Sequence, residues 1–259
     1  MERGNHRGSH EIVLCGVNLG RYSRGAGKDL GWLVRELIST GEDFRIRLSS
    51  IELEDLSAEW VREWSQSDRV CPHLHLPLQS GDDGILRDMG RGYGGEDFKA
   101  AAASLHAIWP GAALTTEVMV GYPGEDDLAF RHTLEVLAQV RPARVHVFRF
   151  SPRPGTRAWS RKDESDLEEA EYRSSLVREL AEGWRLKYIE ERRGELRDML
   201  VEKTLLSGGA RMALGTTEDF MKGVIPNCPP AIEQGDIVTC EICGVTGARA
   251  RMEAGEGRA

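Results

Sequence analysis

The sequence lacks several features that would place it in a special class of protein. No apolar run approaches the roughly 18 residues that a membrane span needs, and no apolar h-region follows Met1. We therefore expect a cytoplasmic protein without a signal peptide or a membrane contact. Aromatic residues make up 7% of the 259 residues, hydrophobic residues 40% and charged residues 29%. This composition excludes a disordered chain and a collagen-like repeat, and it allows a sizeable core.

Cysteine is scarce, and the count of five is odd. An odd count in such a chain favours free thiols and excludes a disulfide-stapled miniprotein. Cys240 and Cys243 form a C-x-x-C within a run that alternates like a strand, so their thiols should face opposite sides. A second C-x-x-C or a paired His motif is missing. We therefore interpret these two cysteines as incidental strand residues rather than zinc ligands.

The charge is acidic, with 42 acidic against 34 basic residues and a net charge of −8. This balance argues against a general nucleic-acid binder. The basic residues are unevenly spread, because residues 141–162 hold seven Arg and Lys and no Asp or Glu. Such a basic stripe either contacts phosphates at one place or forms a solvated rim of charge, and both interpretations stay open.

Up to residue 150, short β-rich runs alternate with helical patterns, which predicts parallel strands joined by right-handed crossovers. Five such units form an incomplete or open barrel rather than a closed one of eight strands. A Pro/Arg-rich loop over 151–165 then leads to a long charged helix over Asp166–Arg193. The expected strands are Glu11–Val17, Phe44–Ser49, His73–Leu78, Leu114–Val120 and Arg144–Phe150. The expected helices are Leu30–Ser39, Ser57–Trp64, Gly84–Met89, Glu96–Ile108 and Asp126–Gln139.

After Gly194 the pattern changes to short alternating runs separated by Gly, Asn and Pro turns. This pattern predicts a small antiparallel β-barrel or sandwich of about 60 residues. We therefore expect two domains, 1–193 and 194–259. The expected strands of the second domain are Leu196–Glu202, Ala210–Thr217, Phe220–Ile225, Asp236–Cys243 and Ala248–Met252.

Polar and glycine-rich segments follow all five strands of the first domain. In parallel β/α sheets, ligands bind at the carboxyl ends of the strands. Gly and Pro let the backbone lie against a flat ligand, and Asn, Gln, Ser and Glu offer hydrogen bonds to an amino acid, a ribose or an adenine. Five such segments in series predict a ligand site at this rim. They are 16–20, 49–52, 79–81, 121–125 and 151–153.

Three other signals have a structural interpretation. The glycine motif over Gly90–Gly95 follows a helix rather than a strand, so it predicts a helix end and a hinge, not a dinucleotide site. His73 and His75 share one strand face, and without a third ligand they favour packing or a hydrogen bond over a metal site. The acidic run at 125–127 is typical of a helix start.

Three segments closely resemble the radical-SAM methylthiotransferases: His73–Tyr93, Val120–Glu125 and His146–Thr156. The resemblance runs from about Glu11 to the end and is nearest to the branch that acts on threonylcarbamoyladenosine in tRNA. The branches acting on isopentenyladenosine in tRNA or on ribosomal protein S12 remain alternatives. The resemblance implies an α/β fold, a partial (β/α) radical-SAM barrel missing its first unit, followed by a small RNA-binding barrel of the TRAM type.

The resemblance also implies a transferase that methylthiolates C2 of a modified adenosine in the tRNA anticodon loop, using S-adenosylmethionine and [4Fe-4S] clusters. Arg91 and Tyr93 match the family's Arg-x-Tyr and are expected to be structural. The positions that match expected S-adenosylmethionine contacts are Asn18, Ser50, Glu52, Gln79, Gly121, Pro123 and Arg153. The positions expected to face tRNA are Arg149, Arg153 and Arg157 in the basic stripe and Lys222 in the terminal barrel.

The family's C-x3-C-x2-C triad and three further cysteines are absent here, and Cys15 and Cys71 do not replace them. We therefore expect the carboxy-terminal portion of such an enzyme, inactive by itself, and leave open whether a separate chain supplies the amino-terminal half. A non-catalytic RNA-binding module on a degenerate barrel is the first alternative. A barrel enzyme of other chemistry, with Glu52 or His75 as acid/base, is the second.

Overall fold

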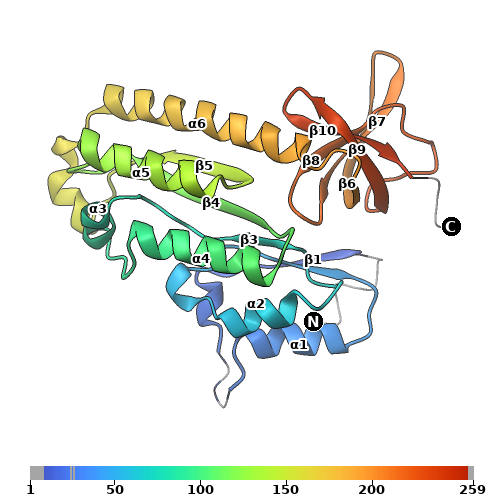
Figure 1. Cartoon of the computed structure of the whole chain (residues 1–259), viewed down its shortest axis with the longest axis horizontal. Coiled ribbons are helices and arrows are strands. Elements are labelled where there is room, and N and C mark those ends of the chain that lie inside the picture. Colours follow the sequence, from blue (N-terminus) through green and yellow to red (C-terminus); the bar gives the residue numbers. More distant parts are fainter. Residues whose placement is uncertain (1–8, 24, 26, 256–259) are drawn as a thin grey trace. The chain divides into compact units, whose positions relative to one another are not determined.

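The computed structural model describes residues 9–23, 25 and 27–255 (Figure 1). The chain divides into two compact units. Unit 1 takes its residues from 1–49, 63–73 and 186–259, and unit 2 from 50–62 and 74–185. Within the described residues, no helix is long and apolar enough to cross a membrane. The expected boundary between residues 193 and 194 stays a prediction.

Unit 2 is built on a sheet of β3 (His73–His75, its first residue in unit 1), β4 (Ala113–Val120) and β5 (Arg144–Arg149), in that order. β4 and β5 run parallel, as the alternation of strands and helices predicts. β3 ends at His75, shorter than expected, although the N–H groups of Leu76 and Leu78 still donate to carbonyls of β4. The helices are α2 (Ala58–Trp64, shared with unit 1), α3 (Asp83–Asp88), α4 (Gly95–Ile108), α5 (Asp127–Val140) and most of α6 (Leu167–Glu190).

Local hydrogen bonds explain where these helices begin. Asp82 accepts from the backbone N–H groups of Gly84 and Ile85 and so caps α3, while Asp126 caps α5 by accepting from Ala129. The acidic run at 125–127 is thus a helix start, as predicted. The glycine motif over 90–95 follows the end of α3 and leads into α4, which confirms the predicted helix end, while the hinge stays a prediction.

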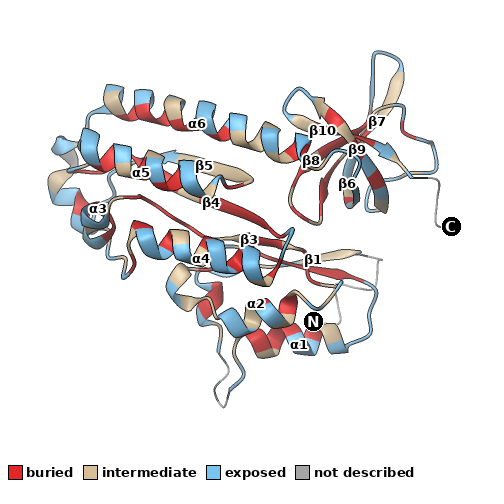
Figure 2. Ribbon diagram, viewed as in Figure 1, coloured by how far each residue is buried: buried red, intermediate tan, exposed pale blue. Residues whose placement is uncertain are grey.

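The strands of unit 2 have one covered and one open face. Along β4, Thr116, Val118 and Val120 are buried, whereas Glu117 and Met119 between them are half-buried. Figure 2 shows the largely buried β4 together with the buried stripe of α5. Since strand side chains alternate between faces, the half-buried residues share the open face, which carries the candidate site.

Unit 1 contains a small parallel sheet and a barrel. β1 (Glu11–Leu14) pairs with β2 (Arg45–Leu48), and α1 (Leu30–Ser39) is capped by Asp29. The barrel strands are β6 (Leu196–Ser207), β7 (Ala210–Thr217), β8 (Lys222–Ile225), β9 (Ile237–Thr246) and β10 (Arg249–Ala254).

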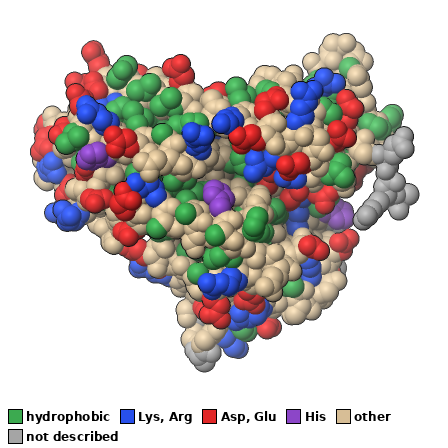
Figure 3. Space-filling view, in the orientation of Figure 1, with side chains coloured by type: hydrophobic (Ala, Val, Ile, Leu, Met, Phe, Trp, Pro, Cys, Tyr) green, Lys and Arg blue, Asp and Glu red, His purple; other side chains and the backbone are tan. Residues whose placement is uncertain are grey.

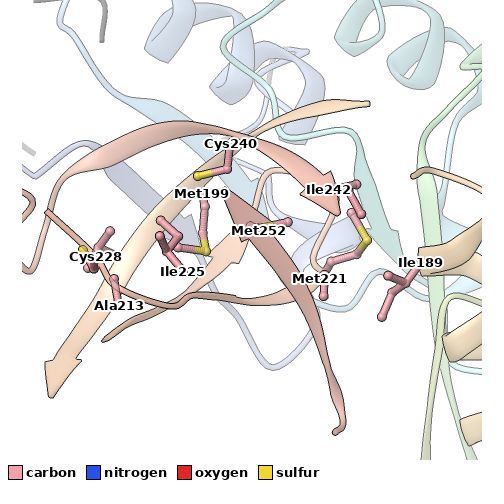
Figure 4. Close-up of a cluster of buried hydrophobic side chains, with 11 residues drawn as sticks. Ile189, Met199, Ala213, Met221, Ile225, Cys228, Cys240, Ile242 and Met252 are labelled. Atoms are coloured by element: carbon pink, nitrogen blue, oxygen red, sulfur yellow. The ribbon is translucent and has the colours of Figure 1, made fainter. Parts of the chain in front are cut away.

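The barrel is closed in the order β10-β8-β7-β6-β9. The prediction of a small antiparallel β-structure is confirmed with one correction, because the closing pair β10–β8 is parallel. Figure 4 shows the core, which includes Met199, Ile242 and Met252. Cys240 is also buried there while Cys243 is only half-buried, as expected for a strand that points them to opposite sides.

Two buried arginines join β2 to the barrel within unit 1. Arg45 and Arg47 both lie 2.7 Å from carboxylate oxygens of Glu11. Their remaining N–H groups donate to backbone carbonyls of the barrel, at Asp198 (2.8 Å) and Thr216 (3.4 Å) for Arg45, and at residues 217 (2.9 Å) and 218 (3.0 Å) for Arg47. These buried guanidinium groups therefore have partners for both their charge and their donors.

Glu218 lies beside this cluster and lacks a full set of partners. Its Oε2 atom is buried without a hydrogen bond, although it lies 4.0 Å from Nη1 of Arg45. Burial, with Asp219 adding repulsion, raises the pKa of Glu218 from 4.5 to about 7. The folded protein therefore binds this proton more tightly than the unfolded chain, and stability is lost as the pH rises from about 4.5 to 7.

We expect Glu218→Gln to raise the melting temperature at pH 8 by at least about 2 °C, because the glutamine needs no proton to stay neutral. At pH 4 the two proteins should melt alike. Thermal unfolding followed by circular dichroism checks this, with Glu241→Gln at an exposed barrel position as control. A gain that is equal at both pH values contradicts the assignment.

Candidate functional site

The open face of the unit 2 sheet carries a layer of polar, titratable side chains. Glu117 and His146 are paired in the register of β4 and β5. His75 contributes Nδ1, 2.9 Å from Oγ1 of Thr115, and Nε2, 3.6 Å from Oε2 of Glu117. Nε2 of Gln79 donates to Oε1 of Glu117 at 2.7 Å. The two imidazole rings lie 5.8 Å apart, centre to centre, so these side chains form one continuous polar layer.

The pKa values of Glu117 and His146 in this layer are both lowered, but for different reasons. The nearby imidazole of His75 lowers the pKa of Glu117, and the hydrogen bond from Gln79 adds to the effect. Burial lowers the pKa of His146, and the nearby Arg144 lowers it further. The layer thus favours an ionised Glu117 and a neutral His146, which can accept or donate one hydrogen bond.

Next to the polar layer lies a cavity of about 520 Å³. Met119 and Phe148, paired in the register of β4 and β5, form one wall. Tyr122 and Phe150 also line it, with their rings edge to face at 5.4 Å. The cavity therefore combines apolar walls with polar groups at its rim, as small-molecule sites do. The polar side chains that line it include Gln79, Asp88, Arg91, Arg149, Arg153 and Arg157.

The segment after α3 places an ion pair at this rim. Arg91 pairs with Glu52, a residue that was expected to contact the ligand. Tyr93 is buried, and its hydroxyl donates to the carbonyl of Pro77 at 2.9 Å. The hydrogen bond of Tyr93 agrees with the structural role expected for it, while Arg91 reaches the cavity.

The loop after β4 is fixed by a glycine and a buried charge pair. Gly121 has a φ of 75°, and a Cβ atom there would lie 2.5 Å from the Cβ of Ala170 on α6. Its N–H donates to Oε2 of Glu125 at 2.6 Å, and that oxygen lies 3.1 Å from Nη1 of Arg173. Burial raises the pKa of Glu125. The side of Gly121 that a side chain would occupy therefore faces α6.

The residues expected to contact S-adenosylmethionine have different surroundings. Gln79 and Arg153 line the cavity, and Glu52 reaches it through Arg91. The carbonyl of Pro123 accepts from Arg161 at 3.2 Å, and Pro123 lines a separate hollow. Ser50 is exposed beside His75, and Asn18 belongs to unit 1. All seven assignments stay predictions.

Carboxylates neutralise much of the basic stripe. Arg149 pairs with Glu171, and Arg157 lies 3.4 Å from Asp88. In the barrel, Lys222 lies 3.0 Å from Glu202. Figure 3 accordingly shows acidic and basic side chains interspersed over the face in view. The phosphate contacts expected of Arg149, Arg153, Arg157 and Lys222 stay predictions.

Sequence reasoning missed the apolar cavity. Its wall residues Met89, Met119 and Phe148 come from three separate elements, so no local pattern joins them. One signal was available, because His146, Phe148 and Phe150 alternate along β5 and so lie on the same face. The two histidines singled out earlier have defined partners: His73 stacks on Phe220 at 4.3 Å within unit 1, and His75 bonds to Thr115.

In the part of the chain that the structure describes, the cysteine thiols do not form a site for an iron–sulfur cluster. No group of three or more His, Cys, Asp or Glu side chains there is placed to hold a metal ion, and the five cysteines are free. Burial raises the pKa of Cys71 to about 11 and that of Cys240 to about 12.

Comparisons with known proteins agree on one family. Residues 3–137 match the model of the radical SAM superfamily. The chain is 39% identical over 202 residues to the threonylcarbamoyladenosine tRNA methylthiotransferase MtaB of Thermotoga maritima, covering 78% of this chain and 46% of that protein. It is 31% identical to the tRNA-2-methylthio-N6-dimethylallyladenosine synthase of Endomicrobium trichonymphae, covering 76% and 47%. The chain thus spans about half the length of the curated relatives it matches.

A solved structure shows the same fold at low sequence identity. The coproporphyrinogen III oxidase HemN of Escherichia coli, described as a radical SAM enzyme, aligns with a TM-score of 0.51 and 12% identity. The alignment covers 82% of this chain and 54% of that one. This likeness supports a mixed α/β radical SAM fold and says nothing of the substrate.

We expect Arg144→Gln to raise the pKa of His146, because it removes a positive charge that disfavours the imidazolium form. The shift is measured by NMR titration of the imidazole resonances. Arg131→Gln, on the exposed side of α5, is the control and should leave this pKa unchanged. A fall of the pKa in the Arg144 variant contradicts the electrostatic assignment.

We expect Gly121→Ala to destabilise the protein more than Gly155→Ala. Both positions have positive φ, 75° and 82°, so each alanine carries a backbone cost of about 1–2 kcal/mol. Only at Gly121 does the new Cβ also overlap another residue, Ala170 on α6. Chemical denaturation measures the free energy of unfolding of both variants. Equal losses would contradict the expectation, because they would show that α6 moves away from the new Cβ atom without a loss of stability.

Proposed function

Because the chain belongs to the radical SAM superfamily, we propose that it binds S-adenosylmethionine in the cavity of unit 2 and serves the methylthiolation of an adenosine in tRNA. Its similarity to tRNA methylthiotransferases over most of its length supports the reaction and the substrate. Within this class we propose threonylcarbamoyladenosine in the anticodon loop, in the cytoplasm. The resemblance of the segments 16–20 and 146–156 to that branch supports the choice.

The observation that carries the proposal is the chemistry of the cavity. Its volume of about 520 Å³ suits a cofactor-sized ligand. Met89, Met119 and Tyr122 offer an apolar wall for a flat adenine ring. Beside that wall, the amide of Gln79 is both a hydrogen-bond donor and an acceptor. The residues present therefore fit S-adenosylmethionine.

The Arg91–Glu52 pair complements the charged end of this ligand. An amino acid carries an ammonium and a carboxylate, and a guanidinium beside a carboxylate presents the opposite arrangement. We propose that Arg91 binds the carboxylate and Glu52 the ammonium group. When bound, S-adenosylmethionine supplies methyl and 5′-deoxyadenosyl groups in this superfamily. The role of this chain's own residues is to bind and orient it.

The described cysteines do not fit an iron–sulfur cluster, since no three of them gather at one place. We therefore assign no step of radical formation to these residues. The second candidate function is a non-catalytic RNA-binding module. In both candidates we propose that residues 194–259 form an RNA-binding barrel of the TRAM type, with Lys222 on its RNA-facing side. In both candidates Arg149 and Arg157 face the RNA as well.

We expect the full chain to bind S-adenosylmethionine in isothermal titration calorimetry, and Arg91→Ala to weaken this binding by about 10- to 100-fold. That range corresponds to a charge-assisted hydrogen bond of about 1.5–3 kcal/mol. Arg131→Ala, an exposed arginine on α5, is the matched control and should bind like the wild type.

A wild-type chain that binds tRNA but gives no heat with S-adenosylmethionine would contradict the first candidate and support the RNA-binding module. If the Arg91 and Arg131 variants bind S-adenosylmethionine with equal affinity, the chain binds the cofactor but Arg91 is not one of its contacts.

A further inference from the structure

We propose that Phe148 and Arg153 bind one nucleotide of the RNA substrate at the mouth of the cavity, with Phe148 stacking on the base and Arg153 pairing with a phosphate. The inference rests on the proposed function, because RNA is the partner proposed there. It adds the two side chains that hold the nucleotide.

The ring of Phe148 is available for stacking. Half of this side chain, 50%, is exposed although it lies on a β-strand at a cavity wall. Its neighbour Phe150 is already engaged with Tyr122, whereas no aromatic ring among the described residues stacks on Phe148. Proteins that bind single-stranded nucleic acid use such exposed rings beside cationic groups as stacking platforms.

Arg153 is the charge that remains free at this mouth. Four arginines line the cavity, and three of them have carboxylate partners: Glu52 for Arg91, Glu171 for Arg149 and Asp88 for Arg157. Among the residues that the structure describes, Arg153 has no ion-pair partner and is exposed. A guanidinium without a carboxylate partner is suited to bind phosphate.

The backbone at Arg153 is held in a defined turn. The hydroxyl of Thr156 donates to the carbonyl of Arg153 at 2.7 Å, and the N–H of Thr156 donates to the same oxygen at 3.2 Å. Gly155 within this turn has a φ of 82°, which glycine adopts at little cost. The turn therefore presents Arg153 from a preorganised backbone, which lowers the entropy cost of binding.

A base with a phosphate fits this pair better than S-adenosylmethionine does. S-adenosylmethionine and the RNA each contain an adenine ring and an anionic group, so either ligand could supply the base and the anion that Phe148 and Arg153 bind. The Arg91–Glu52 pair already complements the charged end of S-adenosylmethionine. Arg153 is then a second cationic group, which matches the phosphate that only the RNA supplies.

The test measures binding of a fluorescently labelled anticodon stem-loop RNA to the full chain by anisotropy. We expect Phe148→Ala and Phe148→Leu to weaken binding by about 5- to 100-fold, the range for one stacked base. Phe148→Trp should retain binding, because it keeps an aromatic face. Tyr172→Ala, an aromatic residue on α6 with 62% exposure that does not line the cavity, is the control and should bind normally.

For the charge, we expect Arg153→Ala to reduce the slope of log Kd against log salt by about one, as the loss of one phosphate contact predicts. Arg131→Ala should leave this slope unchanged. Circular dichroism of each variant shows whether the fold is retained. If Phe148→Ala or Arg153→Ala does not fold, Phe148→Leu or Arg153→Gln is used in its place.

The outcomes separate this inference from the proposed function. Normal RNA binding by the Phe148 and Arg153 variants overturns the inference. If the same variants instead lose S-adenosylmethionine in calorimetry, the mouth belongs to the cofactor, and the proposed function stands. If the wild-type chain binds neither ligand, the proposed function itself fails.

Discussion

The burial of two guanidinium groups on β2 is the constraint on which the organisation of unit 1 depends. A buried charge without partners costs several kcal/mol, so Arg45 and Arg47 require both a counter-charge and acceptors for every N–H. Glu11 on β1 supplies the charge, and backbone carbonyls of the barrel supply the acceptors. The two arginines therefore tie the barrel to the small sheet within unit 1, and burial beside Asp219 raises the pKa of Glu218.

Unit 2 solves a different problem, which is to keep one face of a parallel sheet open. The covered face is apolar or hydroxyl-bearing, whereas the open face carries first the polar layer around Glu117 and then the cavity beside Phe148. Arg173 and Glu125 fix the loop between β4 and α5, and Gly121 lets α6 approach that loop closely. The proposed binding of cofactor and nucleotide uses the open face and leaves the covered face to packing.

Much of the fold follows from local patterns, and the deviations have local causes as well. The cap residues Asp82 and Asp126 begin α3 and α5 as helix chemistry requires. β6 runs on to Ser207, beyond its predicted end, because the Gly208–Gly209 turn allows a longer hairpin with β7. Of the polar and glycine-rich strand ends, those at Gln79 and Arg153 line the cavity, whereas the open side of Gly121 faces α6.

The sequence by itself determined the order and type of the elements and the residues that cap them, because hydrophobic period, capping and turn chemistry act over a few positions. Only the tertiary structure decided which charges are free. Asp88 is shared by Arg157 and Arg161, and Glu171 pairs with Arg149, while Arg153 remains without an ion-pair partner within the described residues. Such pairings join residues from separate elements, so they follow from packing and cannot be read from spacing along the chain.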